Sequence, residues 1–133
     1  MRNLLVFGDN LEFLEDVYRE EDPLIRGRVK GKVNLIYIDP PFATADEFWN
    51  QEGAKAYQDK RTGGKFLEFL RRRLILAKEI LAPDGSIFVH LDQKMSHPVK
   101  VILDEVFGRS NFRNEIAWCY TGPSQAEIFS EKA

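Results

Sequence analysis

The chain has 133 residues, of which 44% are hydrophobic and 30% are charged, and its formal net charge is −2. This length and apolar content suit one domain with a hydrophobic core. The slightly acidic balance argues against a protein that binds nucleic acid mainly through bulk positive charge, although it leaves room for a local basic cleft.

Three features of the sequence bear on the cellular compartment. Cys119 is the single cysteine, so no disulfide can form within the chain, as is usual in a reducing cytoplasm. No apolar run reaches the roughly 18 residues that a membrane helix needs. The segment from Met1 to Asp9 is too short and too soon acidic for a signal peptide. We therefore expect a cytoplasmic protein that does not associate with membranes.

The amino-terminal part predicts a strand followed by a helix. Leu4–Phe7 is a short apolar run typical of a buried strand, and Gly8 interrupts it. Asp9 or Asn10 can cap a helix, whose apolar positions recur at helical spacing: Leu11, Leu14, Val17 and Tyr18. Residues 20–32 predict a loop, and their basic stretch RGRVKGK fits a solvated loop better than a phosphate contact.

The middle of the chain predicts a buried strand, a long connection and a second helix. Val33–Ile38 is apolar almost throughout, as expected for a parallel strand that is covered on both faces. Residues 43–64 form a long polar stretch with glycines, which favours a functional loop or lid. The next helix has apolar residues at three- and four-residue steps: Phe66, Leu67, Leu70, Leu74, Ala77 and Leu81. The arginines at 71–73 lie partly on its other face, where we expect solvent.

The last third of the chain predicts a turn, a strand and a helix. Residues 83–85, Pro-Asp-Gly, indicate a turn, and Ser86–Leu91 forms the third apolar run. Ser96 and Pro98 mark the start of a helix, and Gly108 marks its end. The residues that we expect to face inward from this helix are Val99, Ile102, Leu103 and Val106.

Strands and helices therefore alternate, with Ile116–Tyr120 as a candidate fourth strand, and this order predicts an α/β fold with a parallel sheet. Ligands of such sheets bind outside the carboxyl ends of the strands. Asp9, Asp39 and Asp92 each follow an apolar run closely. An acid in this place is often only a helix cap, and for Asp9 the two interpretations are evenly balanced. A cap is a poor interpretation of Asp39, because two prolines follow it.

The stretch Asp39-Pro40-Pro41-Phe42 predicts a rigid group of hydrogen-bond acceptors. Each proline fixes its own φ angle and lacks an N–H group, and a residue before proline is held extended. The Asp39 carboxylate therefore lies near carbonyl oxygens that no helix consumes. Such a group suits an amino group, which offers two N–H donors from one atom. A stiff turn without function is the alternative interpretation.

The exocyclic amine of a nucleobase is a ligand that this group of acceptors can activate. The amine is a poor nucleophile because its lone pair is delocalised into the ring. Accepting both of its hydrogens favours a tetrahedral nitrogen, and the Asp39 carboxylate then stabilises the positive charge that develops during attack. The ring of Phe42 can stack on the base, which is worth about 1–3 kcal/mol.

At this point the sequence resembles a known enzyme family. The tetrad at 39–42 is similar to the catalytic motif [D/N/S]-P-P-[Y/F/W] of the amino-methylating DNA methyltransferases, which use S-adenosyl-L-methionine. Other stretches resemble blocks of the β-type subgroup, which includes the modification subunits of type III restriction systems: LLVFGDNLEFL, GKVNLIYIDPPFATADEF, AYQDK, FLRRRLILAKEILAPDGSIFVHLD, HPVKVILDEVFG and NFRNEIAWCY. The resemblance covers Leu4 to Tyr120. It implies a partial Rossmann-like methyltransferase fold with a mostly parallel sheet and flanking helices.

The resemblance also implies roles for individual residues. The catalytic set is Asp39, Pro40, Pro41 and Phe42, with Phe42 stacking on the target base. Asp9 and Asn10 match a segment near the adenosine of the cofactor, to which Asp39 is also assigned. Trp118 matches a region that lines the base pocket, and ordinary core packing is an equally good interpretation of this residue.

Two histidines and one further acid are assigned to structure rather than to chemistry. His90 and Asp92 lie in VHLD, a recurrent block of the subgroup, and we expect them to form a hydrogen-bonded strand end. His90 and His97 do not predict a metal site, because no third and fourth ligand follow at a suitable spacing.

One departure from the family limits what the chain can do alone. The family holds the methionine end of the cofactor with a glycine-rich loop, Asp-Pro-Phe-x-Gly-Ser-Gly, and neither this motif nor a target recognition region is present in residues 1–133. We therefore expect the amino-terminal part of a larger catalytic domain, whether a fragment, a truncated gene or one half of a split protein.

The implied substrate is double-stranded DNA. The candidate protein partners are the missing carboxyl-terminal half, a second copy and a restriction subunit. The expected activity is methylation of adenine N6. The alternatives are methylation of cytosine N4, which uses the same tetrad, and a non-catalytic remnant that pairs with a partner chain.

Overall fold

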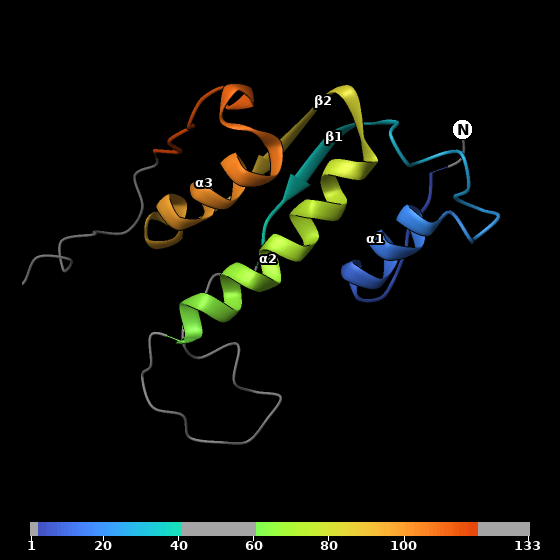
Figure 1. Cartoon of the computed structure of the whole chain (residues 1–133), viewed down its shortest axis with the longest axis horizontal. Coiled ribbons are helices and arrows are strands. Elements are labelled where there is room, and N and C mark those ends of the chain that lie inside the picture. The colour runs from blue at the N-terminus through green and yellow to red at the C-terminus, as the bar shows by residue number, and fades with distance from the viewer. Residues whose placement is uncertain (1–2, 41–60, 120–133) are drawn as a thin grey trace, which may run out of the picture.

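The computed structural model describes residues 3–40 and 61–119. Its elements are α1 (Asn10–Arg19), β1 (Val33–Ile38), α2 (Arg61–Ile80), β2 (Leu81–Val89), α3 (Gln93–Phe107) and a short 3-10 helix η1 (Arg109–Asn111). β1 and β2 pair in parallel, and α2 crosses in front of them between α1 and α3 (Figure 1). The predicted α/β class, with parallel strands and flanking helices, is confirmed.

The strand pair is covered on one face only within the described residues. Ile38, Ile87 and Val89 pack against the core that α2 and α3 build. The alternate residues Leu35 and Tyr37 are 60% and 64% exposed. The expectation that β1 is covered on both faces is therefore wrong for this structure, because α2 and α3 supply their apolar side chains to the same face of the sheet.

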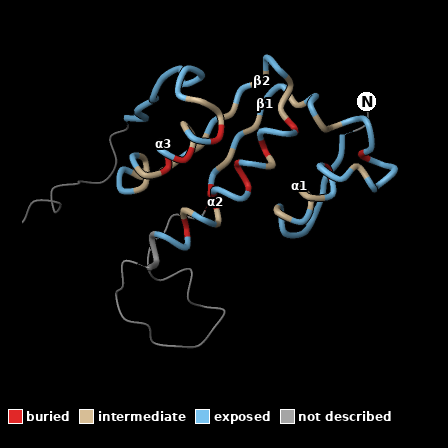
Figure 2. Tube along the Cα trace, in the orientation of Figure 1, coloured by how far each residue is buried: buried red, intermediate tan, exposed pale blue. Residues whose placement is uncertain are grey.

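The core confirms the apolar spacing that predicted the second and third helices. Phe66, Leu70 and Leu74 of α2 are almost completely buried, and they pack against Val99, Ile102 and Val106 of α3. Figure 2 shows buried segments in both helices. Full burial of one such side chain contributes about 1.5–3 kcal/mol. This core therefore holds α2 and α3 against β1 and β2.

α2 differs from the prediction at both of its ends. α2 begins at Arg61, so residues 61–64 of the predicted loop are helical, and the remainder, 43–60, lies outside the described residues. Leu81, which the spacing placed on the helix, begins β2. The predicted turn at 83–85 lies within β2 as an irregularity, because Val33 pairs with Leu81 while Leu35 pairs with Ser86.

Gly85 allows this irregularity to form beside β1. A Cβ atom at this position would lie 2.7 Å from the carbonyl oxygen of Val33 and 2.9 Å from Cδ2 of Leu81. Real Cβ atoms do not approach other atoms so closely, so a larger residue would push β1 and β2 apart.

The third helix begins earlier than the sequence indicated. Asp92, rather than Ser96, caps α3, and its side chain accepts a hydrogen bond from the backbone N–H of Met95 at 2.8 Å. Pro98 lies inside the helix, not at its start, and Gly108 ends it as predicted. The proline was misleading because it is best tolerated in the first turn of a helix.

Two predicted strands are not strands in the structure. Leu4–Phe7 is irregular, and Leu5 is 96% exposed. Ile116 to Cys119 is likewise irregular and exposed, while Tyr120 lies outside the described residues. An apolar run becomes a strand only when a neighbour pairs with its backbone. Neither run has such a neighbour in the described part of the chain, where the sheet consists of β1 and β2.

Candidate active site

The carboxyl ends of β1 and β2 bring Asp39 and His90 together. The two strands are in register at their ends, where Ile38 pairs with Val89 and the N–H of His90 donates to the carbonyl oxygen of Ile38 at 2.8 Å. Asp39 directly follows β1, and its Oδ1 lies 3.6 Å from Nδ1 of His90. Both side chains are more than half exposed, so the carboxylate is accessible to a ligand.

His90 also contacts Tyr37, a residue of β1 that precedes Asp39 by two positions. The Tyr37 hydroxyl lies 3.4 Å from Nδ1 of His90. The sequence predicted a structural strand end for His90 but not its position beside the predicted catalytic carboxylate. The signal was present, because residues that follow neighbouring parallel strands lie at one edge of the sheet.

The tetrad at 39–42 is only half described. Pro40 is buried directly after the exposed Asp39, so the chain is anchored as it leaves β1 while the carboxylate stays accessible. Pro41 and Phe42 lie outside the described residues, and their catalytic and base-stacking roles remain predictions from the sequence.

The structure tests one of the two roles, helix cap and cofactor contact, that the sequence left open for Asp9. Its side chain caps α1, because Oδ1 accepts the N–H of Leu11 at 2.7 Å. The same Oδ1 lies 3.0 Å from Nη2 of Arg73. The cap interpretation is therefore confirmed, while the role of Asp9 and Asn10 in holding a cofactor remains a prediction.

Arg73 corrects the expectation that residues 71–73 face solvent. Arg71 and Arg72 are exposed, but Arg73 is buried to 7% relative exposure. Its Nε donates to Oδ1 of Asn10 at 2.7 Å, and its Nη1 donates to the carbonyl oxygen of Phe69 at 3.0 Å. The arginine thus connects α2 to the start of α1, which helical spacing alone could not reveal.

The remaining two residues singled out in the sequence are Asp92 and Trp118. Asp92 is the cap of α3, as its structural assignment led us to expect. Trp118 is 84% exposed, which rules out core packing among the described residues and leaves its role at the base pocket a prediction.

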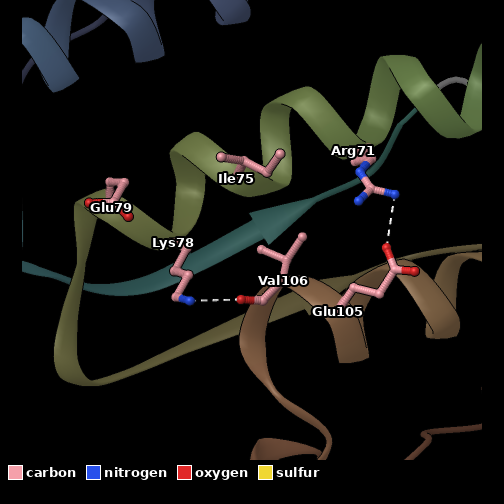
Figure 3. Close-up of a pocket in the computed structure, with 6 residues that line it drawn as sticks. All are labelled: Arg71, Ile75, Lys78, Glu79, Glu105 and Val106. Atoms are coloured by element: carbon pink, nitrogen blue, oxygen red, sulfur yellow. Dashed lines mark hydrogen bonds and ion pairs between the residues drawn. The ribbon is translucent and has the colours of Figure 1, made fainter.

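A groove lies between α2 and α3 and contains none of the predicted site residues. Figure 3 shows it bordered by Lys78 and Arg71 of α2 and by Val106 and Glu105 of α3. Lys78 Nζ donates to the carbonyl oxygen of Val106 at 2.8 Å, and Arg71 pairs with Glu105 at 2.8 Å. We interpret the groove as a seam that joins two helices.

No group of three or more histidine, cysteine, aspartate or glutamate side chains in residues 3–40 and 61–119 is arranged to hold a metal ion. None of the helices in these ranges is long and apolar enough to cross a membrane.

Comparison with known proteins gives the family. Residues 33–132 match the family described as DNA methylase. The chain is 49% identical over 94 residues to the type II methyltransferase M.EcaI of Enterobacter cloacae, which covers 70% of the chain and 21% of that protein. It is 39% identical over 112 residues to the probable type III restriction-modification enzyme HindVI Mod subunit of Haemophilus influenzae, covering 84% and 13%.

A third relative is more distant. The type III restriction-modification enzyme EcoP15I Mod subunit of Escherichia coli is 28% identical over 144 residues, which cover 88% of the chain and 21% of that protein. The chain thus spans 21% or less of the length of these three relatives. Because the family match extends over most of its residues, the chain belongs to the N6/N4 DNA methylase family.

Proposed function

We propose that the chain is the catalytic-motif portion of a site-specific DNA methyltransferase that transfers a methyl group from S-adenosyl-L-methionine to N6 of adenine. The observation that carries the proposal is the position of Asp39. Its exposed carboxylate follows a strand at the edge of a parallel sheet, in the motif that the family uses for an exocyclic amine. Double-stranded DNA is the proposed substrate, from which the target base must be flipped out of the stack.

The chemistry asked of Asp39 is electrostatic. The carboxylate accepts a hydrogen bond from the amine and stabilises the positive charge that the nitrogen gains as the new N–C bond forms and the C–S bond of the methyl donor breaks. The contact with His90 at 3.6 Å limits the orientations that the carboxylate can adopt. Phe42 holds the base by stacking. Most of the remaining rate enhancement comes from positioning the base against the methyl donor.

The described residues fit one end of the proposed cofactor. S-adenosyl-L-methionine supplies an electrophilic methyl group when it is bound. Both hydrogen bonds of Asp9 use Oδ1, so Oδ2 is left to accept a hydrogen bond from an adenosine hydroxyl or amino group. The chain contains no glycine-rich Asp-Pro-Phe-x-Gly-Ser-Gly stretch for the methionine end. We infer that a further polypeptide segment, or a partner chain, supplies it.

The decisive experiment is methylation of plasmid DNA by the product of the complete coding sequence, read base by base. N6-methyladenine at one recognition sequence supports the proposal, and N4-methylcytosine would favour the second candidate. The cytosine alternative is retained because the family includes both activities. Unmodified DNA together with a stable complex between this chain and a partner would favour the non-catalytic module. A catalytically inactive Asp39→Ala protein is the matched control for background methylation by the host.

A further inference from the structure

Arg73 is the one charged side chain that the described residues bury almost completely. Its guanidinium carbon lies 3.5 Å from the centre of the Phe69 ring, and its nitrogens reach three different acceptors. Nη1 donates to the Phe69 carbonyl oxygen at 3.0 Å, Nε to Asn10 Oδ1 at 2.7 Å and Nη2 to Asp9 Oδ1 at 3.0 Å. The planar group is therefore held both by stacking and by hydrogen bonds.

These hydrogen bonds use Oδ1 of Asp9 and Oδ1 of Asn10, and they leave the second polar atom of each side chain available. Asp9 Oδ1 accepts from both Leu11 and Arg73, while Oδ2 has no hydrogen bond among the described residues. Asn10 Oδ1 accepts from Arg73, while its amide nitrogen likewise has no acceptor in this part of the chain. The Asp9 side chain is 55% exposed, so an acceptor and a donor are held next to each other where a ligand can reach them.

We propose that Arg73 is a positioning residue for the cofactor, which sets the orientation of the Asp9 carboxylate and the Asn10 amide. This inference rests on the proposed function, because it assigns these two residues to the adenosine of S-adenosyl-L-methionine. An adenosine presents hydroxyl and amino donors for Asp9 Oδ2, and oxygen and ring-nitrogen acceptors for the Asn10 amide. Side chains that are already oriented lose less conformational entropy when they bind such a ligand.

Lysine cannot replace arginine in this role. The guanidinium offers donors in a fixed plane that reach Asp9, Asn10 and Phe69 together, whereas an ammonium is a single point on a flexible stem. Arg73→Lys therefore keeps the buried charge but releases at least one of the two residues that it orients. A rotation of these side chains misplaces the ligand. A misplacement of about 1 Å commonly lowers the reaction rate about a hundredfold.

The experiment uses the product of the complete coding sequence and measures the dissociation constant for S-adenosyl-L-methionine by calorimetry. We expect Arg73→Lys to raise it by about tenfold or more. The Michaelis constant for S-adenosyl-L-methionine should rise in parallel, while that for DNA should change by less than about twofold. Arg72→Lys is the matched control, because the Arg72 side chain is 58% exposed and, among the described residues, its one ion pair is with Glu15 at 4.0 Å. The dissociation constant of the Arg72→Lys protein for S-adenosyl-L-methionine should equal that of the wild type.

A second variant guards against misfolding. Phe69→Leu leaves the charge and the hydrogen-bonding groups of Arg73 intact and removes the ring on which the guanidinium lies, together with its stacking on Phe66. We expect a smaller rise in the same dissociation constant, with a thermal melt recorded for every variant. If Arg73→Lys and Phe69→Leu bind S-adenosyl-L-methionine as tightly as the wild type while melting at a lower temperature, Arg73 only joins two helices and the proposal is overturned.

The two proposals can fail separately. A wild-type protein that binds S-adenosyl-L-methionine but leaves DNA unmethylated overturns the proposed function, and the comparison of dissociation constants still decides the role of Arg73. A wild-type protein that methylates DNA, with an Arg73→Lys variant of unchanged affinity, overturns the role of Arg73 alone.

Discussion

Nδ1 of His90 lies 3.6 Å from Oδ1 of Asp39, and the two residues come from neighbouring parallel strands whose ends are in register. The hydrogen bond from the His90 N–H to the Ile38 carbonyl oxygen fixes their separation. A residue that the sequence assigned to structure therefore adjoins the residue that it assigned to catalysis.

Replacing Asp39 tests the catalytic assignment. Asp39→Ala in the complete protein should reduce the rate of methyl transfer by at least about 10²–10³, the usual loss when one preorganised electrostatic partner is removed. The fold should survive, because the Asp39 side chain is 57% exposed and not part of the core. Single-turnover methylation and a thermal melt measure the two effects. Near wild-type transfer would refute the assignment, and simple unfolding would show that Asp39 is a structural residue.

Replacing His90 tests whether its contact with Asp39 matters. His90→Ala should lower the single-turnover rate by about tenfold, because the carboxylate loses a neighbour that restricts its orientation. The affinity for S-adenosyl-L-methionine should not change. The matched control is His97→Ala, an exposed histidine on α3, which should methylate at the wild-type rate. Equal rates for the two variants would show that the contact has no catalytic consequence.

Replacing Phe42 separates base binding from chemistry. Phe42→Ala should weaken binding of the flipped base by about 1–3 kcal/mol, the contribution of one stacked ring, because the ring holds the base without touching the transferred methyl group. The expected result is a raised Michaelis constant for DNA with a smaller change in the single-turnover rate at saturation. Phe42→Trp should restore DNA affinity. A loss confined to the rate at saturating DNA would contradict a stacking role.

The isolated chain should bind S-adenosyl-L-methionine weakly or not at all. It retains the Asp9 and Asn10 side chains but has no glycine-rich loop for the methionine end. Calorimetry on residues 1–133, beside the complete protein as a positive control, makes the comparison. Micromolar affinity for the isolated chain would show that these residues contain a full cofactor site.

Gly85 should be required for the close approach of β2 to β1 at the start of β2. Gly85→Ala places a methyl group 2.7 Å from the Val33 carbonyl oxygen, and we expect the free energy of unfolding to fall by about 1–3 kcal/mol, as for other overpacked sites. Gly64→Ala is the control, since nothing lies within 4 Å of a Cβ atom there. In a helix this second change should stabilise the protein by up to about 1 kcal/mol. Chemical denaturation of both variants gives the comparison.

The sequence by itself determined the elements whose signals are local. The apolar run at Val33–Ile38 predicted β1 with its observed bounds, and the spacing of Phe66, Leu70 and Leu74 predicted the buried side of α2. The acid before Asn10 predicted a cap. Each of these features depends on interactions between residues a few positions apart in the chain.

The tertiary structure decided everything that depends on which segments meet. Leu4–Phe7 has the composition of a strand but lacks a paired neighbour among the described residues, so it is irregular and exposed. Arg71, Arg72 and Arg73 are consecutive arginines of one helix. Arg73 alone of the three is buried, because α1 packs against its side of α2. His90 reaches Asp39 only because two strands, which are separated by a long connection, pair in register. Contacts between distant segments follow from the packing of whole elements, which no local pattern specifies.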